Sequence, residues 1–122
     1  MARIIVIDDN EAARSTMRRV LERVGHEVLE ASEGDAGLKL LAETGVTLVI
    51  TDIFMPGQEG IQTILEVREH FPQVKLLAIS GGAKHYVMDS LPEARAFGAH
   101  RTLAKPFTAQ ELLDTVSAVL AQ

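Results

Sequence analysis

The chain has 122 residues and a formal net charge of −5, from 17 Asp and Glu against 12 Lys and Arg. It contains no cysteine, which excludes a disulfide framework, a thiolate metal site and a cysteine nucleophile. The acidic balance argues against a protein that acts mainly on nucleic acid, and no apolar run approaches the ~20 residues of a membrane helix. The N-terminus lacks the layout of a signal peptide, so we expect one soluble, cytoplasmic domain over residues 1–122.

Short apolar runs alternate with helical patterns along the chain. The expected strands are residues 4–7, 27–31, 46–51, 74–79 and 101–104. The first, third and fourth of these show little polar alternation, which is typical of strands buried on both faces of a sheet. The expected helices are residues 11–24, 35–43, 60–70, 89–97 and a last one that begins at a capping box of Thr108 and Glu111. Five strands that alternate with five helices predict an α/β fold with a parallel sheet covered on both faces.

Two of the helices have apolar faces that we expect to be buried. In the first helix these residues are Met17, Val20, Leu21 and Val24. In the last helix they are Leu112, Leu113, Val116, Val119 and Leu120. The residues expected to end the first three helices are Gly25, Gly45 and Pro72.

Polar side chains follow four of the expected strands at their carboxyl ends. The first strand is followed by Asp8 and Asp9, the third by Asp52, the fourth by Ser80 and the fifth by Lys105. Because the carboxyl ends of parallel strands lie at one edge of the sheet, where α/β proteins bind ligands, we expect these side chains to converge. Three adjacent carboxylates repel one another unless a cation compensates, and oxygen ligands without cysteine suit Mg²⁺ better than Zn²⁺.

These motifs, in this order, resemble the receiver domain of two-component response regulators over essentially the whole chain. The matching motifs are Asp8-Asp9, Asp52 with Met55-Pro56 and Gly60, Ser80-Gly81, Gly98-Ala99 and Lys105-Pro106-Phe107. The resemblance implies a flavodoxin-like α/β fold, with a doubly wound, five-stranded parallel sheet in the strand order 2-1-3-4-5. It also implies a phosphorylation-dependent signalling switch or phosphoryl carrier that is not a turnover enzyme. Its implied partners are a histidine kinase or a histidine phosphotransfer protein, and a downstream protein target.

The resemblance assigns chemical roles to the matching positions. Asp52 is the expected phosphoacceptor, whose carboxylate attacks the phosphoryl group of a phosphohistidine and forms an acyl phosphate. Asp9, with Asp8 through water, is expected to hold Mg²⁺ together with Asp52 and the backbone carbonyl of Phe54. Lys105 is expected to pair with an oxygen of the phosphoryl group.

Further positions are assigned a role in geometry or in output. Ser80 is expected to hydrogen-bond a second phosphoryl oxygen, Pro106 to follow a cis peptide bond, and Gly60 to allow a close approach at the start of the third helix. Receivers usually have an aromatic residue where this chain has Thr102, so the side chain of the usual switch is replaced here. Smaller rearrangements of Thr102 and its neighbours, or of the loop that begins at Gly81-Gly82, are expected to carry the output instead.

Two other functions compete with this interpretation. An aspartate-nucleophile phosphatase of the haloacid dehalogenase type also uses Asp, Lys and Mg²⁺, but its nucleophile normally lies in an Asp-x-Asp pattern, whereas Asp52 is followed by Ile53 and Phe54. A degenerate receiver that only binds partners is disfavoured by the intact aspartates and lysine. The chain is either a free-standing receiver or a receiver cut from a longer protein, and we expect it to contact neither DNA nor a membrane.

Cationic side chains outside these motifs are expected at the surface. The arginines of the first helix, at spacings that place them on one face, are Arg14, Arg18, Arg19 and Arg23. We favour a solvated face with ion pairs to Glu11 and Glu22 over a face that docks an acidic or phosphorylated partner. The histidines, which show no metal-ligand spacing, are His26, His70, His85 and His100.

Overall fold

The computed structural model describes residues 2–53, 59–80 and 98–122. Its elements are β1 (Arg3–Ile7), α1 (Glu11–Arg23), β2 (Glu27–Ala31), α2 (Gly34–Glu43), β3 (Leu48–Asp52), α3 (Glu59–His70), β4 (Lys75–Ser80), β5 (Arg101–Ala104) and α5 (Ala109–Ala121). All five expected strands and four of the expected helices are confirmed, and the helix expected at residues 89–97 lies outside the described residues. Among the helices of the described ranges, none has the length and apolar character needed to cross a membrane.

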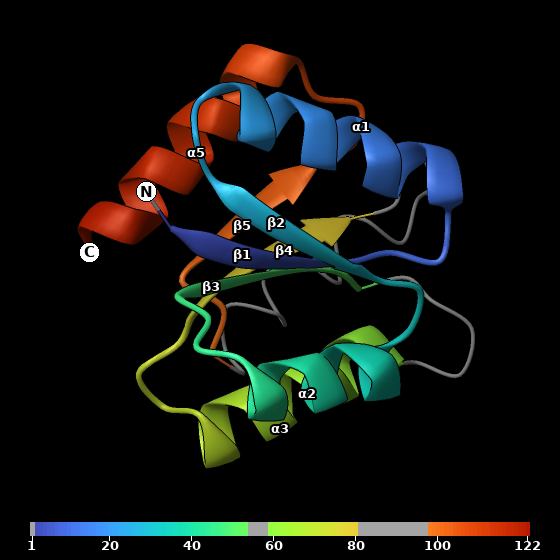
Figure 1. Ribbon diagram of the computed structural model, residues 1–122, viewed down its shortest axis with the longest axis vertical. Helices are drawn as coiled ribbons and strands as arrows, with labels where there is room; N and C mark the ends of the chain where they lie inside the picture. Colours follow the sequence, from blue (N-terminus) through green and yellow to red (C-terminus); the bar gives the residue numbers. More distant parts are fainter. Residues whose placement is uncertain (1, 54–58, 81–97) are drawn as a thin grey trace.

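The five strands form one parallel sheet in the order β2-β1-β3-β4-β5, as expected. Figure 1 shows α1 and α5 on one face of this sheet and α2 and α3 on the other. Because all strands run in the same direction, their carboxyl ends meet at one edge. The strand order reverses between β1 and β3, which is the point where doubly wound sheets bind their ligands.

Two apolar layers hold the helices against the sheet. Side chains of β1 alternate between the layers, so that Ile4 and Val6 pack toward α1 and α5, whereas Ile5 and Ile7 pack toward α2 and α3. All five residues of β3 are buried. Burial of one such aliphatic side chain contributes about 1.5–3 kcal/mol, so β1 and β3 are firmly anchored on both faces. The strands that end in aspartates are therefore rigid supports for whatever chemistry those aspartates perform.

The ends of α1 and α5 follow from local sequence signals. Thr108 and Glu111 form the expected capping box at the start of α5. Asn10 caps α1, because its side chain accepts a hydrogen bond from a backbone N–H of the first turn. Gly25 has a φ of 98°, as expected of a glycine that ends a helix. Val24 was expected on the buried face but is 46% exposed, because it is the C-cap of α1 and lies beyond the last helical turn.

The end of α2 differs from the expectation. Gly45 was expected to stop this helix, but the helix ends at Glu43 and Thr44 is its C-cap in an extended conformation. Both the backbone N–H and the hydroxyl of Thr44 donate to the carbonyl oxygen of Leu40. The threonine hydroxyl thus adds a second hydrogen bond to a carbonyl oxygen of the last turn.

Candidate functional site

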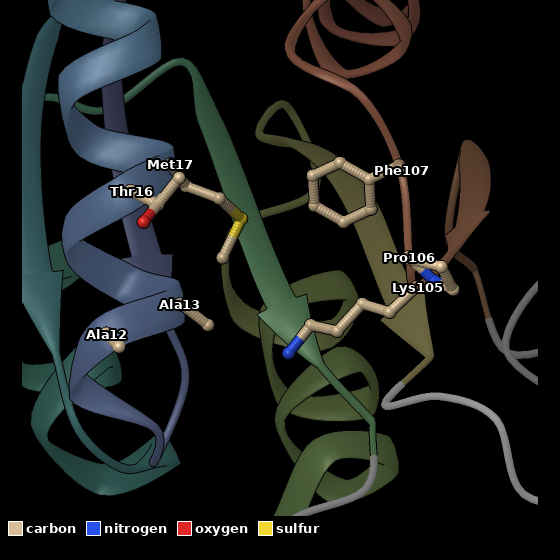
Figure 2. A pocket seen from close by; sticks show the side chains of 7 residues that line it. All are labelled: Ala12, Ala13, Thr16, Met17, Lys105, Pro106 and Phe107. Carbon is tan, nitrogen blue, oxygen red and sulfur yellow. The ribbon is translucent and has the colours of Figure 1, made fainter.

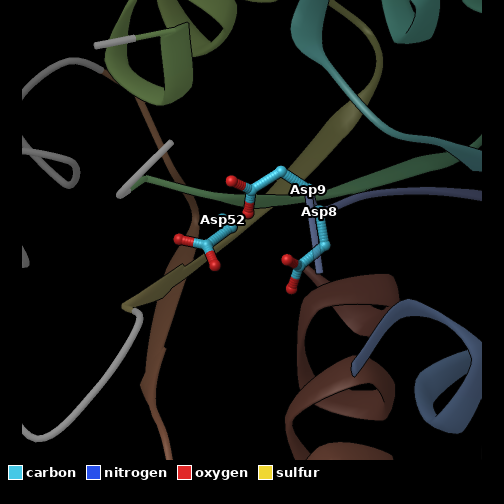
Figure 3. A group of neighbouring side chains, drawn as sticks. All are labelled: Asp8, Asp9 and Asp52. Carbon is cyan, nitrogen blue, oxygen red and sulfur yellow. The ribbon is translucent and has the colours of Figure 1, made fainter. Parts of the chain in front are cut away.

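Three aspartates meet at the carboxyl edge of the sheet. Asp8 and Asp9 directly follow β1, and Asp52 is the last residue of β3. Each offers a carboxylate oxygen that lies within 4.8 Å of the other two (Figure 3). Asp8 is fully buried and Asp52 is 4% exposed, whereas Asp9 is exposed to solvent. The expected convergence is confirmed, with two carboxylates inside the protein and the third at its surface.

Lys105 reaches this cluster from the end of β5. Its Nζ donates to Oδ2 of Asp8 at 2.9 Å and to Oδ2 of Asp52 at 3.1 Å. Burial alone would lower the pKa of Lys105, but the hydrogen bond to Asp8 and the charge of Asp52 outweigh burial and raise this pKa above its ordinary value. The ammonium group therefore stays charged and offsets part of the acidic cluster. The Lys105–Pro106 peptide bond is cis, as expected.

Gly60 lets α3 begin against the strand end that carries Asp52. A Cβ atom at Gly60 would lie 2.3 Å from the Cα of Ile53 and 2.5 Å from the carbonyl oxygen of Asp52. Both are backbone atoms of a buried segment, so they cannot move aside without displacing the strand end. The expected close approach at the start of the third helix is confirmed.

Ser80 ends β4, beside the strand that carries Asp52. The register pairs Asp52 with Ile79, so Ser80 lies one residue further toward the same edge. The Ser80 side chain is fully buried, and its hydroxyl has no hydrogen-bond partner within residues 2–53, 59–80 and 98–122. A buried polar group without a partner costs about 1–3 kcal/mol, which distinguishes Ser80 from an ordinary strand residue.

The residues expected to take part in output are only partly described. Thr102 lies in β5, half-buried and paired with Ala78 of β4. Phe54, expected as a backbone ligand of the metal, lies outside the described residues, as do Gly81 and Gly82.

Arg14 contacts the site, although its sequence position did not assign it there. Its Nη1 donates to the backbone carbonyl oxygen of Asp8 at 2.7 Å, and its Nε pairs with Glu30 of β2 at 2.9 Å. The available signal was helical spacing, since a residue one turn into α1 can fold back on the strand end that precedes the helix. Arg18 pairs with Glu22 at 2.9 Å, as expected, and also with Glu30 at 2.9 Å, which was not expected.

Two histidines differ from the expectation of surface positions. His26 and His100 are half-buried, and the Nδ1 of each accepts a backbone N–H at 3.1 Å, from Ala2 and Leu76 respectively. Burial lowers the pKa of both imidazoles. The expectation is wrong for these two because a single histidine before a strand gives no periodic signal of burial. The other two are His70, which is exposed as expected, and His85, which lies outside the described residues.

An apolar groove of about 490 Å³ lies beside the acidic cluster (Figure 2). It is formed by α1 and by the segment that joins β5 to α5, and Met17 and Phe107 face each other across it. Its lining residues are Ala12, Ala13, Thr16, Met17, Lys105, Pro106 and Phe107. Lys105 borders both the groove and the acidic cluster. The groove was not predicted from the sequence, although the small residues at the start of α1 were an available signal.

A doubly wound parallel sheet with buried aspartates and a lysine at its carboxyl edge defines a class of α/β proteins whose chemistry lies at the strand ends. Within that class, residues 4–117 match the response regulator receiver domain, and the chain belongs to this family. It is a receiver domain of two-component systems, whose function is phosphorylation-dependent signalling. The haloacid dehalogenase alternative is set aside, because the match is to the receiver family.

The similar proteins differ greatly in length. Protein PilH of Pseudomonas aeruginosa is 33% identical over 121 residues, which cover 99% of both chains. Response regulator protein FleR of the same organism is 33% identical over 116 residues, which cover 95% of this chain. The chain spans 12–24% of the length of four longer relatives, among them FleR. The crystal structure of a response regulator receiver domain protein from Clostridium thermocellum has a TM-score of 0.90 at 32% identity and covers 99% of this chain and 95% of that one.

Proposed function

We propose that this domain accepts a phosphoryl group on Asp52 from a histidine kinase or a histidine phosphotransfer protein, in a Mg²⁺-dependent reaction. It then acts as a phosphorylation-dependent switch, or as a phosphoryl carrier, toward a downstream protein target. One observation carries this proposal: the nearly buried carboxylate of Asp52 lies 3.1 Å from Nζ of Lys105 and within 4.8 Å of the carboxylates of Asp8 and Asp9. The ammonium group of Lys105 lies beside this carboxylate and would offset the negative charge of an incoming phosphoryl group.

The proposed reaction transfers a phosphoryl group from a nitrogen to a carboxylate oxygen. An oxygen of Asp52 forms a bond to phosphorus while the bond from phosphorus to the imidazole nitrogen of the donor breaks. The imidazole leaves with the bonding electron pair and takes up a proton, and Asp52 becomes an acyl phosphate. The present contact of Lys105 with Asp52 supports a later contact with a phosphoryl oxygen. Water then cleaves the acyl phosphate, which releases phosphate and restores the carboxylate. Because the group that is modified is the domain's own side chain, we regard the domain as a switch and not as a turnover enzyme.

The donor set of the acidic cluster suits a hard divalent cation. Asp8, Asp9 and Asp52 offer carboxylate oxygens and no sulfur, which favours Mg²⁺ over Zn²⁺. Three carboxylates and one ammonium group leave two negative charges that a divalent cation would balance. We propose Asp9, Asp52 and the backbone carbonyl of Phe54 as direct ligands, and Asp8 as a ligand through water. When bound, Mg²⁺ offsets charge on the transferring phosphoryl group.

The proposed route from phosphorylation to output begins at Ser80. Its buried hydroxyl, which has no partner in the described part of the chain, supports a hydrogen bond to a phosphoryl oxygen. Because Gly81-Gly82 follow directly in the sequence, that bond would draw their loop toward Asp52. We propose that this loop and Thr102 carry the change to a partner protein. The scheme requires no contact with DNA or a membrane, and we place the domain in the cytoplasm.

Intact-mass spectrometry with Mg²⁺ and acetyl phosphate tests the proposed site. We expect the chain to gain the mass of one phosphoryl group, and this gain to disappear in Asp52→Asn and after treatment with EDTA. Asp114→Asn is the matched control, because Asp114 is an exposed aspartate of α5 outside the acidic cluster. Phosphorylation of Asp52→Asn to the wild-type extent would disprove the acceptor, and full phosphorylation in EDTA would disprove the metal requirement.

A further inference from the structure

Arg14 ties the strand end that carries Asp8 and Asp9 to the neighbouring strand. Its Nη1 donates to the backbone carbonyl oxygen of Asp8 at 2.7 Å, and its Nε donates to Oε1 of Glu30 at 2.9 Å. The Arg14 side chain is only 15% exposed. One guanidinium group of α1 therefore links Asp8, which directly follows β1, to Glu30, which lies within β2 and pairs with Val6.

The carbonyl group of Asp8 depends on this contact. The N–H of Asp8 donates to the carbonyl oxygen of Ala31 at 3.1 Å, one residue beyond the paired part of β1 and β2. Because Asp8 is fully buried, its own carbonyl oxygen needs a partner from within the protein. Arg14 supplies that partner through a charge-assisted hydrogen bond, which is stronger than a bond from a neutral donor.

The same contact orients the peptide group between Asp8 and Asp9. A peptide group is planar, so holding the carbonyl of Asp8 also sets the direction in which the chain enters Asp9. The Asp8 carboxylate is restrained separately, by the backbone N–H of Asn10 at 2.9 Å and by Nζ of Lys105 at 2.9 Å. Among the described residues no hydrogen bond holds the exposed carboxylate of Asp9. The position of this carboxylate is therefore set by the backbone around Asp9, which Arg14 holds on one side and Asn10, the N-cap of α1, holds on the other.

Glu30 neutralises the charge that Arg14 brings to this region. Glu30 accepts from Arg14 and from Arg18, each at 2.9 Å, and Arg18 also pairs with Glu22. The hydrogen bonds from Arg18 and Arg14 hold the pKa of Glu30 below its ordinary value, so Glu30 is ionised at neutral pH. Two arginines and two glutamates carry no net charge. Geometry, and not electrostatic potential, is therefore the contribution of Arg14 to the site.

We propose that Arg14 is a positioning residue of the site, which orients the Asp8–Asp9 peptide group so that Asp9 binds the divalent cation together with Asp52. The inference rests on the proposed Mg²⁺-dependent function, and it adds a residue that does not itself touch the cation. Residues that hold metal ligands in place change metal affinity by roughly 10–100-fold when they are lost. Because Arg14 acts through the backbone, we expect a loss at the lower end of this range.

Isothermal titration of the whole chain with MgCl₂ tests the proposal, with Arg14→Lys and Arg14→Met as the variants. Lysine keeps the charge but cannot reach Asp8 and Glu30 at once, so we expect both variants to bind Mg²⁺ about tenfold more weakly than the wild type. Arg18→Met is the matched control, because it removes the ion pairs to Glu22 and Glu30 without touching Asp8. We expect it to bind Mg²⁺ as the wild type does. Thermal unfolding in EDTA establishes that each variant is folded.

Three outcomes would overturn the proposal. If Arg14 acted only through its charge, Arg14→Met would bind Mg²⁺ more tightly and Arg14→Lys would match the wild type. If Arg14 served only stability, both variants would keep wild-type affinity and lose only thermal stability. Loss of affinity in Arg18→Met equal to that in Arg14→Met would assign the effect to the ion-pair network as a whole.

The wild type separates this inference from the function on which it rests. A wild type that neither binds Mg²⁺ nor accepts a phosphoryl group overturns both, whereas normal wild-type behaviour with unchanged Arg14 variants overturns only the role of Arg14. Should the Arg14 variants fail to fold, Glu30→Gln provides the test, because it keeps Arg14 but removes its charged partner. We then expect a smaller loss of Mg²⁺ affinity in the same direction, and unchanged affinity would refute the proposal.

Discussion

The two edges of the sheet are built from different chemistry. At the carboxyl edge, charged groups are crowded together, and Asp8 and Asp52 share Nζ of Lys105. At the amino edge, the imidazoles of His26 and His100 each accept a backbone N–H, beside an exposed ion pair of Arg3 and Glu27. The buried carboxylates of the site edge therefore need a cation to be stable, whereas the two imidazoles of the opposite edge must remain uncharged to accept their hydrogen bonds.

The two histidines occupy equivalent places, each at the start of an outermost strand of the sheet. His26 directly precedes β2 and His100 directly precedes β5, the two outermost strands. The Nδ1 of His26 accepts the N–H of Ala2, which precedes β1. The Nδ1 of His100 accepts the N–H of Leu76 in β4. Burial lowers the pKa of both, and nearby positive charges lower it further. Since only an unprotonated Nδ1 can accept, acid is expected to weaken both edge strands at their starting points.

The largest expected effect is at the carboxyl edge, in Lys105→Met. This substitution leaves the carboxylates of Asp8 and Asp52, which are 0% and 4% exposed, without their ammonium partner. Removing one member of a buried ion pair costs about 3–5 kcal/mol, because a charge is left buried and uncompensated. Because the Lys105 side chain is itself 23% exposed, we expect the free energy of unfolding in EDTA to fall by about 3 kcal/mol, measured by urea unfolding.

Magnesium ions are expected to restore part of the stability lost in Lys105→Met. The cation binds the folded state only and replaces the missing positive charge, so it raises the free energy of unfolding by mass action. Lys39→Met is the control, because Lys39 is an exposed lysine of α2, and it should change stability by less than about 0.5 kcal/mol. An equal loss with and without Mg²⁺ would show that this edge does not depend on a cation.

The next largest effect is expected for Gly60→Ala, which changes the geometry of the same edge without changing its charge. The new Cβ would overlap backbone atoms of Asp52 and Ile53, and such overpacking costs about 1–3 kcal/mol. We expect a loss of about 2 kcal/mol in urea unfolding and slower phosphorylation by acetyl phosphate. Gly45→Ala provides the comparison, because a Cβ there meets nothing within 4 Å. Equal stability of the two variants would contradict a tight approach at Gly60.

The amino edge is expected to respond to pH in a narrower range and by a smaller amount. The pKa values of His26 and His100 in the folded protein lie below the ordinary 6.5. Above pH 6.5 both imidazoles are therefore neutral in the folded and in the unfolded chain, and their hydrogen bonds contribute fully to stability. As the pH falls below 6.5, the unfolded chain binds protons first, and stability decreases until the folded-state pKa values are reached. Urea unfolding between about pH 7.5 and about pH 5, above the range of most carboxylates, measures this slope.

Asparagine substitutions isolate the contribution of the imidazoles. His26→Asn and His100→Asn keep an acceptor for the backbone N–H but do not titrate, so we expect stability to change less over the same pH range. His70→Asn is the control, because His70 is exposed at the end of α3. A double variant with the wild-type slope would show that the amino edge does not sense acid.

The fold and the carboxyl edge were predictable because their signals are local in the sequence. Apolar runs mark strands that are buried on both faces, and in a parallel sheet every strand delivers its last residues to the same edge. The positions of Asp8, Asp52 and Lys105 at that edge therefore follow from chain order alone. The same holds for Gly60, whose place at the start of α3 next to Asp52 is part of a recognisable motif.

The pairing of Arg14 with Glu30 and the burial of the two histidines were missed because they depend on which strands are neighbours. Arg14 pairs with Glu30, which is 16 positions away and lies on the strand beside β1. His26 and His100 bind backbone groups that are each 24 positions away, across a strand pair. Such contacts require the strand order and the register, and no spacing along the chain indicates them. Even when the strand order is known, the choice of Glu30 as the partner of Arg14 depends on side-chain packing.

The smallest expected effect on stability is that of Glu22→Gln, which removes an exposed ion pair. It provides the comparison for the buried charges of the carboxyl edge. Arg18 and Glu22 are 44% and 42% exposed, so their pairing contributes only about 0.3–0.5 kcal/mol and should vanish near 1 M salt, where the screening length is about 3 Å. Glu66→Gln, whose partner Gln62 is neutral, controls for the substitution itself. In the same salt the loss caused by Lys105→Met should persist, because salt ions do not screen buried groups. If salt removed both losses equally, the carboxyl edge would be an exposed cluster of charges, and the contrast between the two edges would fail.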